Sequence, residues 1–184
     1  MSLRIGSGTL KGRKLSVPKG NQRFSSARTK KAVFDFLAAY LDGARVLDLF
    51  AGAGGLGIEA LSRGARFCLF IDSDSRAVAA LKKNLSTLFL GDCYEVWPLD
   101  FRRALQRLSK TEEKFDLVLV DPPYKQEFLD EFSALLSEHS ILKETGILTI
   151  EHSKRTKFSE PEHLPLWQAR RYGDTVVSYF RAKG

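Results

Sequence analysis

The chain has 184 residues and a mass of 20.7 kDa, the size of one domain. Hydrophobic residues make up 43% and charged residues 28%, which excludes a disordered chain and predicts a packed core. No apolar run reaches the ~18 residues of a transmembrane helix, the first residues lack the apolar stretch of a secretion signal, and Cys68 and Cys93 lie in apolar segments typical of reduced core thiols. We therefore expect a cytoplasmic protein without a membrane segment.

The basic residues are concentrated at the amino end. The net charge is +7 with a pI of about 9.5, and nine basic residues precede Asp35, the first acidic residue. Beyond residue 34, acidic side chains outnumber basic ones by two. This asymmetry predicts a polyanionic partner, most often nucleic acid, although a solvated basic arm would give the same pattern. We expect residues 1–23 to form a basic β-hairpin appendage and residues 24–184 to form the main domain.

Hydrophobic periodicity predicts alternating helices and strands after a glycine-rich start. Residues 1–22 combine short apolar pieces with Gly and Pro, which favours short strands and turns. A helix capped by Ser25 or Ser26 is expected over residues 25–41, before Asp42-Gly43. Further strands are expected at residues 45–50, 67–71, 94–98, 115–120 and 147–150. Further helices are expected at residues 55–63, 75–88, 101–109 and 128–136.

The order of these elements predicts the fold class. Apolar strands separated by helices indicate an α/β fold, Rossmann-like, with a mostly parallel sheet covered by helices on both faces. The carboxyl end differs, because residues 167–172 and 175–180 flank Gly173-Asp174, a turn signal. These two segments predict an antiparallel hairpin at the sheet edge.

A glycine-rich loop follows the first strand of the main domain. Residues 46–57 read V-L-D-L-F-A-G-A-G-G-L-G and contain G-x-G-x-x-G between a strand and a helix. The glycines let the backbone approach a ligand, although a turn that only packs a helix is the alternative. Asp48 lies in the strand end, and Asp72 closes the next strand, where an acid reaches ribose hydroxyls. A nucleoside cofactor is predicted, with a loop less suited to a pyrophosphate.

The tetrapeptide D-P-P-Y, residues 121–124, follows the buried strand 115–120. Ligands of open parallel sheets bind at this edge, and two prolines stiffen the turn and remove two N–H donors. The Asp121 carboxylate and a carbonyl near Pro122 are then acceptors for the exocyclic amine of a base. Hydrogen bonds from both N–H groups to these acceptors would orient the delocalised nitrogen lone pair toward an electrophile, with Tyr124 stacked on the base. A strand-end turn in which Tyr124 only packs is the alternative.

These two motifs together resemble the class I S-adenosylmethionine-dependent amino-methyltransferases. Four other segments make the resemblance more specific: G-S-G-T-L-K-G-R-K-L-S-V-P-K-G at 6–20, A-L-S-R-G-A at 60–65, K-N-L at 83–85 and R-R-Y-G-D-T at 170–175. With them the chain is similar to the bacterial 16S rRNA guanine-N2 methyltransferase family, which modifies one guanine of the small subunit. That family usually reads R-P-T-x-D-R before its first long helix, where this chain has R-F-S-S-A-R at 23–28.

The resemblance implies methyl transfer from S-adenosylmethionine to the N2 amine of a guanine in 16S rRNA. The substrate would be 16S rRNA within the small subunit or an assembly intermediate, and the enzyme a monomer. Asp48 would lie near the cofactor's amino group, Asp72 at its ribose, Asp100 at its adenine amine and Phe101 beside the adenine. The full set of expected cofactor-binding residues is Asp48, Phe50, Gly52, Gly54, Gly57, Asp72, Asp100 and Phe101. The expected catalytic residues are Asp121, Pro122 and Tyr124. The expected RNA-binding residues are Arg4, Lys11, Arg13, Lys14, Arg23 and Arg28.

Three other functions use part of the same features. A DNA or RNA methyltransferase acting on adenine N6 or cytosine N4 would use D-P-P-Y, but such enzymes normally carry a larger target-recognition insert. A nicotinamide-dependent oxidoreductase would have no use for D-P-P-Y. A non-catalytic RNA-binding domain would have no reason to keep Asp48, Asp72 and Asp121 together. No residue cluster indicates a metal site, and methyl transfer from a sulfonium needs no metal.

Overall fold

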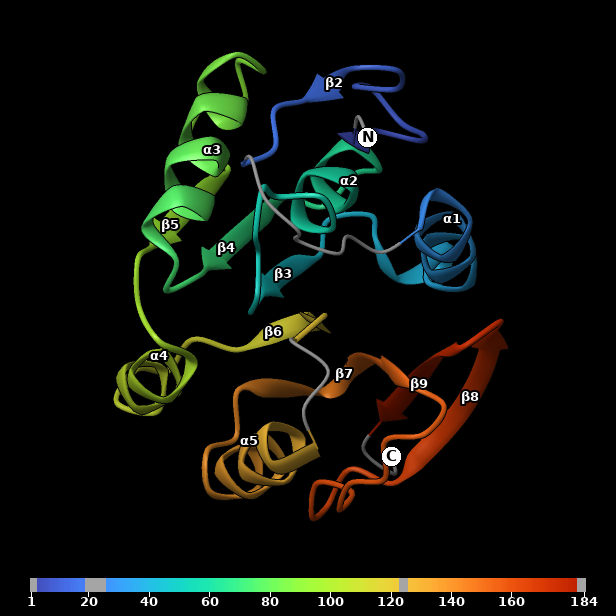
Figure 1. The fold of residues 1–184 in the computed structure, drawn as a ribbon. Coiled ribbons are helices and arrows are strands. Elements are labelled where there is room, and N and C mark those ends of the chain that lie inside the picture. Colours follow the sequence, from blue (N-terminus) through green and yellow to red (C-terminus); the bar gives the residue numbers. More distant parts are fainter. Residues whose placement is uncertain (1–2, 19–25, 123–125, 182–184) are drawn as a thin grey trace.

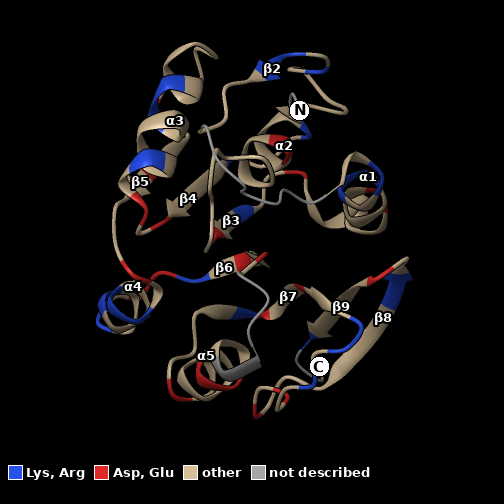
Figure 2. Ribbon diagram, in the orientation of Figure 1, with Lys and Arg blue, Asp and Glu red and all other residues tan. Residues whose placement is uncertain are grey.

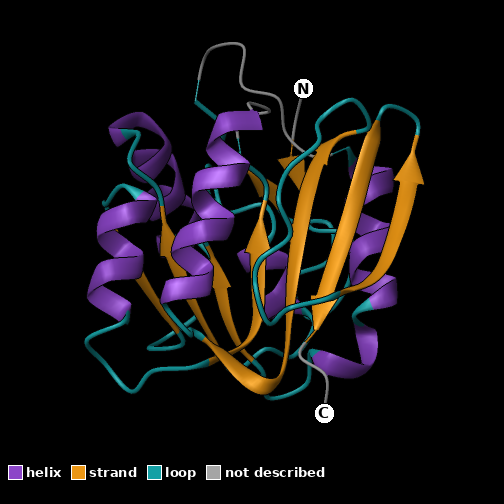
Figure 3. Cartoon of the chain, turned by 90° about the horizontal axis from the view of Figure 1, so that it is seen from below, coloured by secondary structure: helices purple, strands orange, loops and turns teal. Residues whose placement is uncertain are grey.

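A seven-stranded sheet runs through the centre of the molecule, with helices on both faces (Figures 1 and 3). The computed structural model describes residues 3–18, 26–122 and 126–181 of the chain. Within these ranges no helix is both long and apolar enough to cross a membrane. Near the amino end, β1 (Leu3–Arg4) pairs antiparallel with β2 (Lys14–Leu15) as a separate two-stranded sheet.

The strand order of the large sheet is β5-β4-β3-β6-β7-β9-β8. Its strands are β3 (Arg45–Asp48), β4 (Phe67–Ile71), β5 (Tyr94–Trp97), β6 (Phe115–Val120), β7 (Leu142–Ser153), β8 (Leu166–Tyr172) and β9 (Thr175–Arg181). The strands β3 to β7 run parallel to one another, and β9 is antiparallel to both β7 and β8. This confirms the predicted parallel sheet with an antiparallel edge hairpin. The order reverses between β3 and β6, and ligands of open α/β sheets bind outside the carboxyl ends of the strands at such a point.

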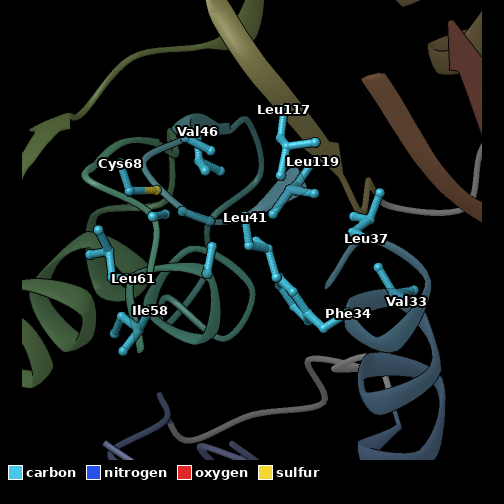
Figure 4. Packing of buried hydrophobic residues seen from close by; sticks show 14 of the residues in the cluster. Val33, Phe34, Leu37, Leu41, Val46, Ile58, Leu61, Cys68, Leu117 and Leu119 are labelled. Atoms are coloured by element: carbon cyan, nitrogen blue, oxygen red, sulfur yellow. The ribbon is translucent and has the colours of Figure 1, made fainter. Parts of the chain in front are cut away.

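Two hydrophobic clusters lie on opposite faces of the sheet. One face is covered by α1 (Ala27–Phe36), the 3₁₀ turn η1 (Ala38–Tyr40), α2 (Gly57–Ser62) and α3 (Ser75–Ser86). The other face is covered by α4 (Phe101–Leu108) and α5 (Gln126–Glu138). Side chains of β6 alternate between them, because Leu117 and Leu119 belong to the first cluster and Val118 and Val120 to the second. Figure 4 shows Leu117 and Leu119 on the same side of the sheet as Leu41 and as Phe34 of α1.

The helix expected over residues 25–41 is instead two pieces. Ser26 caps α1, since its hydroxyl accepts from the backbone N–H of Thr29 at 3.0 Å. The α-helix ends at Phe36, and η1 begins at Ala38, with Leu37 between the two pieces. Short 3₁₀ turns are common at helix ends, and here the chain must turn into β3 directly afterwards. Leu37 and Leu41 both pack in the core on either side of η1.

The strand expected at residues 147–150 is much longer in the structure, from Leu142 to Ser153. The apolar run from which the strand was predicted begins only at Ile147. Before it, Lys143 is half-exposed, Glu144 is exposed, and Gly146 has no side chain. Each end of the longer strand is held by one neighbour: Leu142 pairs with Phe115 of β6, and residues 151–153 pair with β9, whereas the register with β6 shifts between Leu142 and Ile147.

Glu59 of α2 fixes the amino-terminal segment to the main body. This fully buried carboxylate accepts from the backbone N–H groups of Gly6 at 2.8 Å and Ser7 at 3.0 Å. It also pairs with Lys30 at 2.8 Å and Arg63 at 2.9 Å. These contacts hold the pKa of Glu59 below its usual value, in opposition to burial, which is the largest effect and raises it. Residues 6 and 7 are thus held directly against the helix that follows the glycine loop.

Asn84 of α3 makes a second connection, this time to the glycine loop itself. Its side-chain oxygen accepts from the Ser16 N–H at 2.8 Å, and its amide donates to the Ser16 carbonyl and the Ala53 carbonyl, both at 2.9 Å. Ile5 and Leu15 are buried in the cluster on the same face. The described part of the amino-terminal segment therefore packs against α2 and α3. The predicted domain boundary at residues 23 and 24 lies outside the described residues.

Candidate active site

Three aspartates meet at the carboxyl edge of the sheet. Asp48 ends β3, Asp72 follows β4, and Asp121 follows β6. Asp48 is registered with Leu119 of β6 on one side and Phe70 of β4 on the other. The strand ends that carry the three carboxylates are therefore neighbours at the point where the strand order reverses, as the parallel sheet predicts.

Asp48 is almost completely buried, with 1% of its surface exposed. Its Oδ2 accepts from the Gly57 N–H at 2.8 Å, whereas no group in the described part of the chain pairs with its buried Oδ1. Burial raises the pKa of Asp48 to about 7; the Gly57 N–H opposes that rise and the Asp72 charge adds to it. A buried carboxylate with one unpaired oxygen can accept hydrogen bonds from a cationic group such as an amino acid's ammonium.

Asp72 holds the glycine loop to the end of β4. Its Oδ2 accepts from the Gly52 N–H at 2.7 Å, and its Oδ1 accepts from the Asp74 N–H at 2.8 Å. A carboxylate offers about four lone-pair sites, so Asp72 can still accept from hydroxyl groups of a ligand. The carboxylate thus fixes the loop and retains capacity for a ribose.

Two glycines of the loop are required by its geometry. Gly54 has a φ of +89°, and a Cβ there would lie 2.6 Å from Leu81 Cδ1. A Cβ on Gly57 would lie 2.3 Å from Phe70 Cε1, so this glycine allows α2 to pack closely on β4. The G-x-G-x-x-G spacing therefore serves both the turn and the packing of the helix.

The other predicted cofactor residues lie around the start of α4. Asp100 caps this helix, accepting from the Arg102 N–H at 2.9 Å, and forms an ion pair with the Arg102 side chain at 3.2 Å. Phe101 is buried, with its ring centroid 5.7 Å from that of half-buried Phe50 and 4.7 Å from that of Phe128. Cofactor binding by Asp100, Phe50 and Phe101 stays a prediction.

The predicted catalytic and RNA-binding residues are only partly described. Asp121 is half-buried and Pro122 is buried, whereas Tyr124 and Arg23 lie outside the described residues. The other predicted RNA-binding residues are exposed; they are Arg4, Lys11, Arg13, Lys14 and Arg28. Figure 2 shows basic residues along β2 and the loop before it. Arg13 donates to the Thr87 carbonyl at 2.9 Å, which places its guanidinium at the end of α3.

The sequence did not reveal the structural roles of Glu59 and Asn84 or the buried position of Glu151. Glu59 and Asn84 act on segments 52 to 68 residues away, so no local pattern marks them. Glu151 is 5% exposed at the carboxyl end of β7. An acidic residue directly after the apolar run 147–150 was the available signal for it.

Comparison with known proteins places the chain among methyltransferases. A family model described as "Conserved hypothetical protein 95" matches residues 3–181. The chain belongs to this family. It is 39% identical over 184 residues to "Putative rRNA methyltransferase YlbH" of Bacillus subtilis. The match covers 99% of this chain and 100% of that protein.

Two further relatives agree with this placement. The chain is 34% identical over 182 residues to "Ribosomal RNA small subunit methyltransferase D" of Haemophilus influenzae, covering 96% of this chain and 91% of the relative. Its fold matches the solved structure "Putative methyltransferase yhhF from Escherichia coli" with a TM-score of 0.85 and 28% identity over the whole of both chains. The family member described here therefore has the Rossmann-like methyltransferase fold that was predicted.

Proposed function

We propose that this protein transfers a methyl group from S-adenosylmethionine to the exocyclic N2 amine of a guanine in 16S rRNA, acting as a monomer on the small subunit or an assembly intermediate. The observation that carries the proposal is the meeting of three carboxylates at one sheet edge. Asp48 and Asp72 adjoin the glycine loop, and Asp121 begins D-P-P-Y on the next strand. The names of the relatives, which are rRNA methyltransferases, support the substrate class.

The residues around the glycine loop fit S-adenosylmethionine. Its ammonium would occupy the position facing the unpaired Oδ1 of Asp48, and its ribose hydroxyls would donate to Asp72. Asp100 would accept from the adenine amine, with Phe50 and Phe101 lining the same end of the sheet. When bound, the cofactor supplies a methyl carbon made electrophilic by the positively charged sulfur.

Asp121 would act on the guanine. The N2 lone pair of guanine is delocalised into the ring, so the amine is a poor nucleophile unless it is held and aligned. The Asp121 carboxylate would accept one N–H and a carbonyl near Pro122 the other, and the carboxylate charge would favour the positive charge that develops on nitrogen. Because the proton is lost after the transfer, Asp121 does not need to be a strong base.

Methyl transfer to RNA tests the proposed function directly. The purified protein is incubated with S-adenosylmethionine and either naked 16S rRNA or small subunits from cells that lack its gene, and the nucleosides are analysed by mass spectrometry. We expect N2-methylguanosine at one position. N6-methyladenosine or N4-methylcytidine would identify a different amino-methyltransferase, and the absence of any methylated nucleoside from both substrates would contradict the proposal.

Asp72→Ala is expected to weaken S-adenosylmethionine binding while the fold survives. The variant loses a charged acceptor for the ribose and the bond that fixes Gly52, which should cost about 1.5–3 kcal/mol, or roughly 10- to 150-fold in affinity. Isothermal titration calorimetry measures the affinity, and circular dichroism checks the fold. Asp92→Asn, an exposed carboxylate before β5, is the control. Unchanged affinity would remove Asp72 from the cofactor site.

The exposed lysines of the amino-terminal segment are expected to bind RNA phosphates. The double variant Lys11→Gln/Lys14→Gln should flatten the dependence of log affinity on log salt by about 1.4–1.8, because each phosphate contact contributes roughly 0.7–0.9. Point substitutions are preferable to truncation, since Ile5 and Leu15 belong to the core. RNA affinity is measured at several salt concentrations.

The matched control for this pair is Lys110→Gln/Lys114→Gln, beside α4, which covers the opposite face of the sheet from α2 and α3. Lys110 follows α4 and Lys114 precedes β6. Equal salt slopes for both double variants would show that the amino-terminal lysines are only solvated surface. S-adenosylmethionine binding should be unchanged in both.

A further inference from the structure

Glu151 lies beside Asp121 at the carboxyl edge of the sheet. Strands β6 and β7 are parallel, and Val120 is registered with Ile150. Asp121 directly follows β6, and Glu151 is the next residue of β7; the backbones of neighbouring strands are about 4.8 Å apart in a regular sheet. The residue that is proposed to hold the guanine amine therefore has a second carboxylate as its direct neighbour.

The alternation of side chains along the two strands predicts that both carboxylates project on the same face of the sheet. On β7, Ile147 belongs to the cluster under α1 and α2, whereas Leu148 and Ile150 belong to the opposite cluster, so alternation puts Glu151 on the α1 side. On β6 the same alternation through Leu119 and Val120 puts Asp121 on the α1 side. A base held by Asp121 at this edge would present its neighbouring edge atoms to Glu151.

Two buried hydroxyls on this face, those of Thr149 and Tyr179, have no partner among the described residues. Thr149 Oγ1 is two residues before Glu151, and Tyr179 is registered with Thr149 across β7 and β9. Tyr179 is fully buried, and burial above all raises the pKa of its hydroxyl, with the Tyr172 and Glu151 charges contributing. Because buried polar groups are nearly always paired, these hydroxyls point to a polar ligand beside Glu151.

The hydrogen-bonding groups at this edge match those of guanine. The Watson–Crick edge of guanine carries the N2 amine and N1–H as donors and O6 as an acceptor, in that order. Asp121 and Glu151 offer two adjacent acceptors, and the Tyr179 hydroxyl offers a donor on the same face. Adenine presents an unprotonated N1 at the central position, which a carboxylate would repel.

We propose that Glu151 is a specificity-determining residue that accepts the N1–H of the target guanine while Asp121 accepts from its N2 amine. This inference rests on the proposed function and adds the means by which the base is selected. Sites built to bond a particular group reject analogues that lack it by large factors, because the buried partner is then left unpaired.

The test uses an RNA whose target guanine is replaced by 2,6-diaminopurine. This base keeps the N2 amine that receives the methyl group, but its N1 carries a lone pair instead of a proton. Single-turnover kcat/KM for both RNAs is measured with the wild type, with Glu151→Gln and with the control Glu144→Gln, an exposed residue at the far end of the same strand. S-adenosylmethionine affinity is measured for each.

We expect the wild type and Glu144→Gln to prefer guanine by at least about 100-fold. Glu151→Gln should lower that preference at least tenfold, because its amide can donate to the unprotonated N1, and should bind S-adenosylmethionine as the wild type does. If Glu151→Gln does not fold, Glu151→Asp is used; it keeps the charge, so it should lose rate on guanine but retain the preference.

Four results would overturn the inference. Glu151→Gln with wild-type rates would place Glu151 away from the base. If Glu151→Gln lowers the rates on both RNAs in proportion and leaves the preference for guanine unchanged, Glu151 has a structural role only. The same conclusion follows if Glu151→Asp loses the preference for guanine. If the wild type methylates no guanine N2, the proposed function is wrong, and the inference that Glu151 selects guanine is wrong as well.

Discussion

Asp121→Ala is expected to reduce methyl transfer at least about 100-fold while the affinity for S-adenosylmethionine changes by less than about twofold. Removing one preorganised group that acts on developing charge typically costs about 10²–10³ in rate. Asp121 follows β6 at the sheet edge, one strand away from Asp48. Its proposed partner is the base and not the cofactor, so the affinity for S-adenosylmethionine should be nearly unchanged. Single-turnover transfer from radiolabelled S-adenosylmethionine measures the rate, and calorimetry measures the affinity.

Asp121→Asn is the matched control for this loss. Its amide oxygen still accepts an N–H of the guanine amine, but the charge that stabilises the transition state is gone. We expect its rate to lie between those of the wild type and the alanine variant. Near-normal turnover by Asp121→Ala would exclude the proposed role in orienting the amine.

Asp48→Asn is expected to have opposite effects on stability and on cofactor binding. At pH 8 the unliganded variant should be more stable than the wild type by about 4 kcal/mol, because it removes a buried negative charge and keeps an oxygen for the Gly57 N–H. Its affinity for S-adenosylmethionine should fall, because an amide has no charge to pair with an ammonium. Denaturant unfolding and calorimetry measure the two effects.

The sign of the stability effect follows from the raised pKa of Asp48. The pKa is about 7 in the folded protein because of burial, and about 3.9 in an unfolded chain. Between these values the folded state retains a proton that the unfolded state has lost, so wild-type stability falls as the pH rises from about 4 to about 7. The advantage of Asp48→Asn should therefore be full above pH 7 and vanish near pH 4.

The exposed Asp92→Asn serves as the control, and its stability relative to the wild type should not change over this range. If Asp48→Asn shows no pH-dependent gain over the wild type, Asp48 is ionised at neutral pH in the unliganded protein. Binding of S-adenosylmethionine to the wild type near pH 7 should also release a proton from Asp48, which calorimetry in buffers of different ionisation enthalpy detects.

The sequence was most informative where one local pattern decides the structure. Strands β4 and β6 were predicted with their observed bounds, because each is an apolar run between polar residues, broken in β6 only by Asp116, and is largely buried. Strand β7 was predicted too short, because its ends are held by pairing with two neighbours and not by side-chain pattern. The break between α1 and η1 depends on the packing of Leu37 and Leu41 and on the turn into β3, which helical spacing does not encode.

The candidate site, like the fold, could be predicted from the sequence only in part. Asp48, Asp72 and Asp121 were predicted to lie together because parallel strands end at one edge, and the structure brings their strand ends together. The unpaired oxygen of Asp48 could not be predicted, since it depends on the whole shell around the carboxylate. Glu59 and Asn84 were missed because their partners are distant in sequence, so only the folded chain shows that the amino-terminal segment contacts the glycine loop.

The bonds made by Glu59 and Asn84 also affect the order in which the chain can fold during synthesis. Residues 6 to 16 leave the ribosome before the side chains that hold them, which follow 52 to 68 residues later. Such distant contacts are slow to form, because a long loop must close before they stabilise anything. Residues 6 to 16 thus stay unfixed until Glu59 and Asn84 have been synthesised and the helices that carry them have formed.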